Sequence, residues 1–137
     1  RSSIVFGCEG VIIPKKNNPY ETGLLAKSAS GALEAANIIR VPNLSRALSN
    51  LKKEGFWVLG LDIGGKSNMK NIDISGPLVI VIGSEGKGLR RLTKEVCDDF
   101  FSIFVNKKAI ELGIDSLNVS SATSVALYAI NQIRSLS

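Results

Sequence analysis

A glycine-rich stretch that holds one acid, Gly83-Ser84-Glu85-Gly86-Lys87-Gly88, directly follows an apolar, β-branched run at residues 77–82. Backbone groups in such a turn can approach a ligand closely, because glycine has no side chain to intervene. The spacing disfavours the common phosphate loops. Leu89 and Arg90 stand where a Walker A loop needs lysine and then serine or threonine, and the dinucleotide pattern lacks its third glycine. A nucleotide-hydrolysing enzyme therefore stays a weak alternative.

A second polar group, Ser116 and Asn118 on either side of Leu117, directly precedes a helical apolar pattern at residues 119–134. Serine and asparagine are both common helix caps, so capping alone is one interpretation. A single cap does not need two polar residues flanking a leucine. The pair is therefore also a candidate for chemistry.

The composition narrows the chemistry further. The 137 residues contain no histidine, which excludes Ser-His-Asp triads, histidine-activated cysteines and the common zinc sites. We expect no metal. The two cysteines, Cys8 and Cys97, lie far apart, and we expect both to be small buried apolar residues. A formal net charge of +5 favours a polyanionic partner.

Short apolar runs alternate with helical patterns, which predicts an α/β domain with a mainly parallel sheet flanked by helices. Strands are expected at residues 10–14, 38–41, 56–62, 77–82 and 101–105. Helices are expected at residues 21–30, 43–54, 89–99 and 119–134. The run at 77–82 is expected to be a central strand buried on both faces, and the polar segment 63–76 to leave the sheet at an edge where ligands bind.

We expect one domain covering residues 1–137, because the chain can bury one substantial core but not two. No apolar run is long enough for a membrane span and no secretory signal opens the chain, so a cytoplasmic protein is expected. The first residue is Arg1, so we also expect upstream sequence to be missing.

Three motifs in the right order resemble the SpoU (TrmH-like) family of RNA 2'-O-ribose methyltransferases, in the SPOUT superfamily. GSEGKGLRRL resembles the family's second motif, SLNVSSA its third, and Arg1-Ser2-Ser3 with Phe6-Gly7 the tail of its first. The segments between them match the family's framework. The resemblance therefore covers nearly the whole chain.

The resemblance implies a SPOUT fold with a carboxyl-terminal deep trefoil knot, a rare exception to the rule that chains do not thread loops. It also implies S-adenosyl-L-methionine as cofactor, held largely by backbone. The cofactor-binding positions that it gives are Gly83, Gly88, Ile103 and Leu117. At the end of the third expected strand we add Leu61, with the segment as far as Gly64, as a border of the adenosine.

In the family, catalysis is organised by an arginine, a glutamate, a serine and an asparagine. The matching positions are Arg1, Glu85, Ser116 and Asn118. Two alternatives stay open, because Glu85 would also suit the positive end of the following helix and Arg1 would also suit an exposed terminus.

Basic residues near the motifs are expected to bind the RNA backbone: Lys87, Arg90, Arg91, Lys107 and Lys108. RVPNLSRAL and LTKEVCDD look most like the branch that methylates a guanosine of 23S rRNA, with the tRNA guanosine branch as the alternative. A non-catalytic RNA-binding module of the same fold is the alternative from another class. The family also implies a homodimer. Two features depart from its pattern, a long loop at 106–115 and Phe104 in place of proline.

Overall fold

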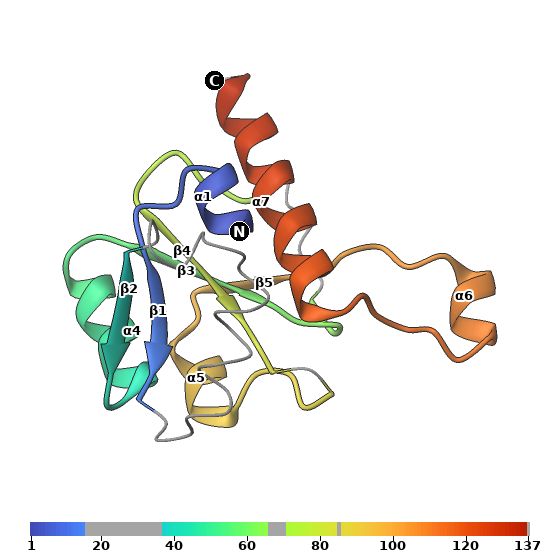
Figure 1. Cartoon of the computed structure of the whole chain (residues 1–137), viewed down its shortest axis with the longest axis horizontal. Helices are drawn as coiled ribbons and strands as arrows, with labels where there is room; N and C mark the ends of the chain where they lie inside the picture. The colour runs from blue at the N-terminus through green and yellow to red at the C-terminus, as the bar shows by residue number, and fades with distance from the viewer. Residues whose placement is uncertain (16–36, 66–70, 85, 137) are drawn as a thin grey trace.

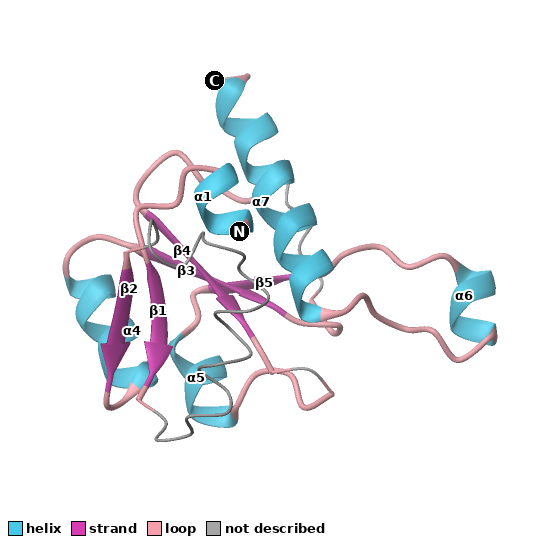
Figure 2. Ribbon diagram, in the orientation of Figure 1, coloured by secondary structure: helices cyan, strands magenta, loops and turns pink. Residues whose placement is uncertain are grey.

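The computed structural model describes residues 1–15, 37–65, 71–84 and 86–136. Parallel strands lie between layers of helices (Figures 1 and 2). The strands are β1 (Val11–Pro14), β2 (Ile38–Val41), β3 (Trp57–Leu61), β4 (Leu78–Ile82) and β5 (Asp99–Phe101). The helices are α1 (Ser2–Val5), α4 (Leu44–Lys53), α5 (Arg91–Val96), α6 (Lys107–Glu111) and α7 (Val119–Ser135).

The described strands form two hydrogen-bonded groups, a parallel pair of β1 with β2 and a parallel three-stranded sheet in the order β4, β3, β5. The α/β class and the parallel pairing are confirmed. The expectation that residues 77–82 form the central strand is wrong for this sheet, because β3 lies in the middle and β4 beside it. An apolar run shows that a strand is covered, but it does not show which strand has neighbours on both sides.

Side chains that alternate along β3 pack into two separate cores. Val58 packs with Leu48, Val81 and Leu89 beneath α4 and α5. The next residue, Leu59, points to the opposite face and packs with Phe101, Ala126 and Ile130 beneath α7. The sheet therefore has α4 and α5 on one face and α7 on the other.

The last helix, α7, uses its small apolar face as core. Ala126 and Ile130 are buried and Ile133 packs against them. An apolar helix face of this kind suits either a core or a partner surface, and for these three residues the structure shows that it is core. Ile72 and Ile74, from the segment that we expected to be polar, are buried in the same cluster.

The short helix α1 lies along α7, and the sequence did not indicate it. The hydroxyls of Ser2 and Ser124 share a hydrogen bond of 2.6 Å. Asn131 Nδ2 donates to the carbonyl of Phe6 at 3.1 Å, and the Phe6 ring meets the ring of Tyr128 edge-on at 6.4 Å. Because residues 2 to 6 run alongside residues 124 to 131, the two helices are parallel.

Most of the expected strands and helices are present, and two of them have other bounds than expected. The strands expected at 10–14, 38–41 and 56–62 and the helices at 43–54 and 119–134 are confirmed, within one or two residues at their ends. The strand expected at 101–105 is displaced, since β5 ends at Phe101, and the helix expected at 89–99 is shorter. The helix expected at 21–30 lies outside the described residues. Among the described helices, none has the length and hydropathy to cross a bilayer.

Candidate active site

Three loops leave the sheet at one edge. Leu61 is the register partner of both Ile82 and Phe101, so β3, β4 and β5 end side by side. The residues that follow these ends are Asp62, Gly83 and Ser102. In parallel α/β sheets this carboxyl edge is where ligands bind. The predicted cofactor positions Leu61 and Gly83 lie at this edge.

The turn after β4 closes tightly on itself. The amide of Gly88 donates to the Ser84 carbonyl at 2.9 Å, and the amide of Ser84 donates to the Gly88 carbonyl at 3.2 Å. A Cβ on Gly83 would lie 2.2 Å from the carbonyl carbon of Gly88, so the chain crosses itself where no side chain fits. Gly86 and Gly88 have φ of 78° and 66°, which favours glycine. Glu85 lies outside the described residues.

The loop after β3 is fastened to the end of β5. A Cβ on Gly65 would lie 2.5 Å from the carbonyl carbon of Phe101, so the two backbones touch. The hydroxyl of Ser102 donates to the Gly65 carbonyl at 2.8 Å, and the amide of Asp62 donates to the Phe101 carbonyl at 3.0 Å. These contacts hold the loops after β3 and β5 together.

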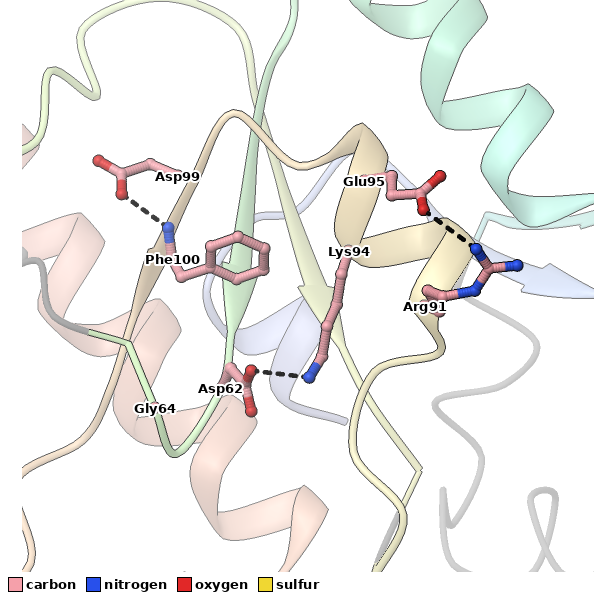
Figure 3. A pocket seen from close by; sticks show the side chains of 7 residues that line it. All are labelled: Asp62, Gly64, Arg91, Lys94, Glu95, Asp99 and Phe100. Atoms are coloured by element: carbon pink, nitrogen blue, oxygen red, sulfur yellow. Dashed lines mark hydrogen bonds and ion pairs between the residues drawn. The ribbon is translucent and has the colours of Figure 1, made fainter.

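An open hollow of about 490 Å³ lies beside this edge, between α5 and the ends of β3 and β5 (Figure 3). Asp62 points across it toward Lys94 of α5, and their charged atoms are 3.3 Å apart. Gly64 and Phe100 contribute apolar surface. The hollow therefore combines an apolar wall with polar groups, as small-molecule sites do.

The third motif ends at the start of α7. Asn118 caps this helix, and its side-chain oxygen accepts from the amide of Ser121 at 2.8 Å. The hydroxyl of Ser116 instead donates to the carboxylate of Asp115 at 3.3 Å, and Leu117 is 47% exposed. Capping therefore explains Asn118 in this structure, but it does not explain Ser116.

Arg1 lies at the amino end of α1 and is exposed. Because α1 runs parallel to α7, with Ser2 beside Ser124, Arg1 falls on the side of α7 that leads back to Asn118. Ser124 lies six positions after Asn118 along α7, a rise of about 9 Å. The structure thus turns the first motif toward the end of α7 that carries the third.

The basic residues fall into two groups. Lys87, Arg90 and Arg91 are exposed in the turn after β4 and at the start of α5. Lys107 and Lys108 lie in α6, which the chain from 102 to 118 carries away from the sheet (Figure 1). The structure therefore does not bring the two groups together.

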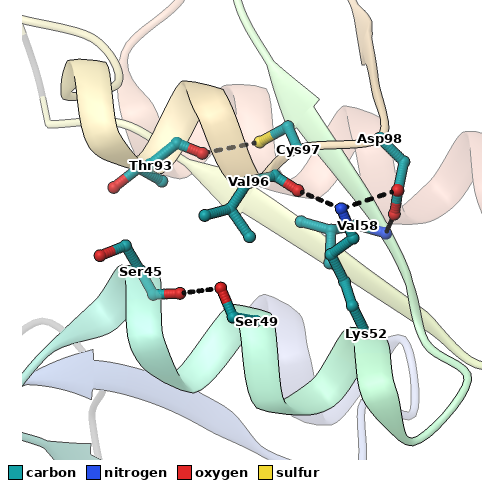
Figure 4. Close-up of polar contacts among 8 residues, drawn as sticks. All are labelled: Ser45, Ser49, Lys52, Val58, Thr93, Val96, Cys97 and Asp98. Atoms are coloured by element: carbon teal, nitrogen blue, oxygen red, sulfur yellow. Dashed lines mark hydrogen bonds and ion pairs between the residues drawn. The ribbon is translucent and has the colours of Figure 1, made fainter.

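Ile103 does not end a strand as expected, because it lies two residues beyond β5. The expectation for the cysteines is wrong for Cys8, which is exposed. Cys97 lies partly covered between α5 and the sheet, and its thiol donates to the Thr93 carbonyl at 3.3 Å (Figure 4). Among the described residues, no cluster of three metal-binding side chains occurs.

Comparison with known proteins identifies the family. The model of the SpoU rRNA methylase family matches residues 1–128. The chain belongs to this family. It is 42% identical over 134 residues to the 23S rRNA (guanosine-2'-O-)-methyltransferase RlmB of Coxiella burnetii. This match covers 98% of the chain and 52% of the relative. It is 38% identical to the putative TrmH family tRNA/rRNA methyltransferase YacO of Bacillus subtilis, with the same coverage. The chain thus spans about half the length of the curated relatives that it matches.

Solved SpoU structures share the fold. One of them is the methyltransferase AviRb from Streptomyces viridochromogenes, solved in complex with AdoMet. It superposes with a TM-score of 0.83 at 24% identity, and the match covers 98% of this chain and 51% of the AviRb chain. The TrmH/SpoU tRNA modifying enzyme of A. aeolicus matches 98% of the chain and 66% of its own with a TM-score of 0.75, also at 24% identity. These likenesses confirm that the chain has the α/β fold of the SpoU structures.

Sequence reasoning included Asp62 only within the segment from Leu61 to Gly64, and it missed three other residues near this edge. Lys94 faces Asp62 across the hollow, and Gly65 with Ser102 ties two of the loops. An acid directly after a strand, followed by a glycine pair, was a visible signal for Asp62 and Gly65. Lys94 had no comparable signal, because it lies thirty-two residues away and only the packing of α5 brings it near.

Proposed function

We propose that residues 1–137 are a single catalytic domain that transfers a methyl group from S-adenosyl-L-methionine to a ribose 2'-hydroxyl of RNA, most specifically of a guanosine in 23S rRNA. The observation that carries the proposal is the convergence of the loops after β3, β4 and β5 in a chain of the SpoU family. Relatives such as RlmB of Coxiella burnetii, named for 23S rRNA guanosine methylation, support this choice of RNA.

The residues at the edge fit a cofactor held by backbone. An added Cβ at Gly64 or Gly86 would meet no atom within 4 Å, so open space lies beside these backbones. We assign the holding groups to Leu61, Gly83, Gly88, Ile103 and Leu117. S-adenosylmethionine supplies an electrophilic methyl carbon on a positively charged sulfur. The task of the protein is to place the ribose oxygen in line with that carbon and to exclude water.

Residues 1–137 offer no imidazole to accept the proton of the hydroxyl, because they contain no histidine. Arginine stays protonated at any ordinary pH and is no base. In our proposal Arg1 clamps a phosphate of the RNA and stabilises the developing alkoxide, while Glu85, Ser116 and Asn118 orient the groups around it.

Replacing Arg1 by lysine in the full-length protein tests this clamp. Lysine keeps the charge but loses the two-pronged geometry, so we expect kcat to fall by roughly two orders of magnitude, with S-adenosylhomocysteine affinity unchanged. Single-turnover kinetics measure the chemical step. Turnover near that of the wild type would remove the clamp from the proposal.

The reaction is tested by incubating the full-length protein with methyl-labelled S-adenosylmethionine and separate 23S rRNA and tRNA transcripts. We expect label in 2'-O-methylguanosine from the rRNA. Label in tRNA alone would move the chain to the tRNA branch, which the TrmH/SpoU tRNA modifying enzyme of A. aeolicus represents. Absence of label from both RNAs, with binding of RNA but not of S-adenosylhomocysteine, would favour a non-catalytic RNA-binding module.

We further propose that the carboxyl-terminal part of the complete enzyme forms the deep trefoil knot of the family. The segment 102–118 supports this, since it leaves the sheet at the cofactor edge and exposes Phe104, Leu112 and Ile114 at 88%, 76% and 57%. Threading would bury such side chains against the other loops. A crystal structure of the full-length protein with S-adenosylhomocysteine tests the path of this segment.

We also propose that the enzyme is a homodimer. The helices α1 and α7, which touch each other, expose Val5, Val125 and Tyr128 at 74%, 44% and 56%. Exposed apolar groups gathered on neighbouring helices indicate a contact surface. Such a dimer would place the partner close to Arg1, at the amino end of α1.

A further inference from the structure

A polar groove of about 400 Å³ runs between α4 and α5, away from the cofactor loops. Its α4 wall carries Arg46, Asn50 and Lys53, and its α5 wall carries Leu92, Glu95 and Val96. Leu92 is the last residue of the second motif, and Glu95 also lines the hollow beside the sheet edge. The α4 wall belongs to neither the motifs nor that hollow, so the groove extends the surface beyond the candidate active site.

The two helices run in the same direction, which sets where the groove begins. Lys52, near the end of α4, bonds to the Val96 carbonyl at 3.0 Å and pairs with Asp98 at 3.1 Å, both at the end of α5 (Figure 4). α4 starts just after β2 ends and α5 starts just after the turn that follows β4. The groove therefore opens at the carboxyl edge of the strands and leads away from it.

The α4 wall presents a row of unpartnered polar side chains, two of which are cations. Arg46, Asn50 and Lys53 are spaced four and three residues apart, so they line one stripe of the helix. All three are exposed, and within the described part of the chain their side chains have neither hydrogen bond nor ion pair. Arg46 and Lys53 are about 10 Å apart along the axis. They can hold two separate anionic groups.

The α5 wall is suited to a ligand that carries apolar groups beside its charges, and a free ion carries none. Leu92 is 55% exposed and offers apolar surface opposite the cations. Glu95 is the acid of the groove, and it pairs with Arg91 at 3.5 Å, which offsets its charge. A chain of phosphates joined by sugars satisfies both walls, because phosphates suit Arg46 and Lys53 and a sugar or base edge suits Leu92.

We propose that this groove binds the phosphate backbone of the RNA strand that flanks the target nucleotide. The inference rests on the proposed function, since it extends the path of the same RNA. Lys87, Arg90 and Arg91 hold the strand at the active-site edge, and Arg46 with Lys53 guide it along α4. Binding here adds affinity and orientation but takes no part in the methyl transfer.

The test compares full-length wild type with Arg46→Gln/Lys53→Gln and with the control Arg40→Gln. Arg40 is also exposed, but it lies on β2 and does not line the groove. Binding of a labelled 23S rRNA fragment is measured from low to high salt. We expect the double variant to bind roughly tenfold more weakly, with a salt slope smaller by about 1.4 for two lost contacts to a single strand. Affinity for S-adenosylhomocysteine should not change.

The outcomes separate this inference from the proposed function. If the wild type binds and methylates RNA but the double variant keeps its affinity and salt slope, the groove is not an RNA track and the proposed function stands. An equal loss in Arg40→Gln would also overturn the inference, because the effect would then be one of overall charge. If the wild type neither binds nor methylates RNA, the proposed function itself fails. The variant Arg46→Lys/Lys53→Arg keeps both positive charges and should bind the RNA fragment nearly as tightly as the wild type.

Discussion

At the scale of single residues, two glycines shape the turn that follows β4. Gly83 leaves no room for a Cβ, because the carbonyl carbon of Gly88 would lie 2.2 Å from it, and Gly88 has φ of 66°. These requirements belong to the backbone and hold whatever ligand the turn meets. The turn after β4 is therefore the part of the site most sensitive to a small change.

Gly83→Ala should open this turn. The added methyl meets backbone atoms, which cannot move aside as a flexible side chain could, so we expect a loss of about 1–3 kcal/mol in unfolding free energy. We also expect at least tenfold weaker S-adenosylhomocysteine binding. Gly76→Ala is the matched control, since a Cβ there meets nothing within 4 Å. Equal cofactor affinity in the two variants would show that the turn is not a binding element.

The two cysteines should differ in reactivity. Burial, with the Asp98 charge adding to it, raises the pKa of Cys97 to about 11, so its thiol stays protonated at pH 8. Desolvation also raises the pKa of the Cys8 thiol, but Cys8 is exposed and open to the reagent. Iodoacetamide at pH 8 should therefore label Cys8 first, as mass spectrometry of Cys8→Ser and Cys97→Ser variants can show. Because the folded state holds the Cys97 proton more tightly, its contribution to stability is present below pH 9 and is lost toward pH 11. Equal labelling rates would contradict this assignment.

The motifs placed a glycine turn at Gly83 and Gly88, and the structure explains its backbone geometry. The cofactor and catalytic roles of the motif residues stay predictions. The motifs could not identify Lys94, which reaches Asp62 only because α5 packs beside the end of β3. Contacts between distant segments have no local signal, whereas glycine turns and helix caps do.

At the scale of elements, caps and packing together decide where helices and strands begin. The side chain of Asn43 accepts from the Arg46 amide at 3.0 Å and from the Ser45 hydroxyl at 2.8 Å, which fixes the start of α4. Asn43→Ala should therefore lower the free energy of unfolding by about 1 kcal/mol. Asn50→Ala, within the same helix, should change it little or raise it. Urea unfolding measures both, and an unchanged Asn43→Ala protein would show that packing alone sets the start of α4.

The errors at this scale have identifiable causes. β5 begins at Asp99, before the apolar run, because Asp98 bonds to the backbone of Val58 through both its amide and its carboxylate and so sets the register with β3. That register comes from the fold, and no local pattern contains it. α6 did have local signals in the sequence, namely an asparagine at its start and a glycine after its end. In the structure Asn106 caps the helix, and Gly113 follows it with φ of 84°.

At the scale of the whole molecule, the proposed dimer depends on the exposed apolar groups of α1 and α7. A surface that carries Val5 and Val125 favours contact with a second copy, which removes these side chains from water. Because Arg1 begins α1, we expect the proposed dimer to affect activity as well. A dimer through this surface would bring a second copy close to the first motif.

Val5→Glu with Val125→Glu should convert the full-length protein from dimer to monomer, because two buried charges per copy would cost more than the apolar contact contributes. Sedimentation equilibrium measures the mass, and circular dichroism checks that the helices remain. We expect methyl transfer to fall at least tenfold in the monomer. Ile39→Glu is the control, since Ile39 is 43% exposed on β2, which lies outside α1, α7 and the segment 102–118. A double variant that stays dimeric would place the interface on another surface, and a fully active monomer would show that one copy contains the whole site.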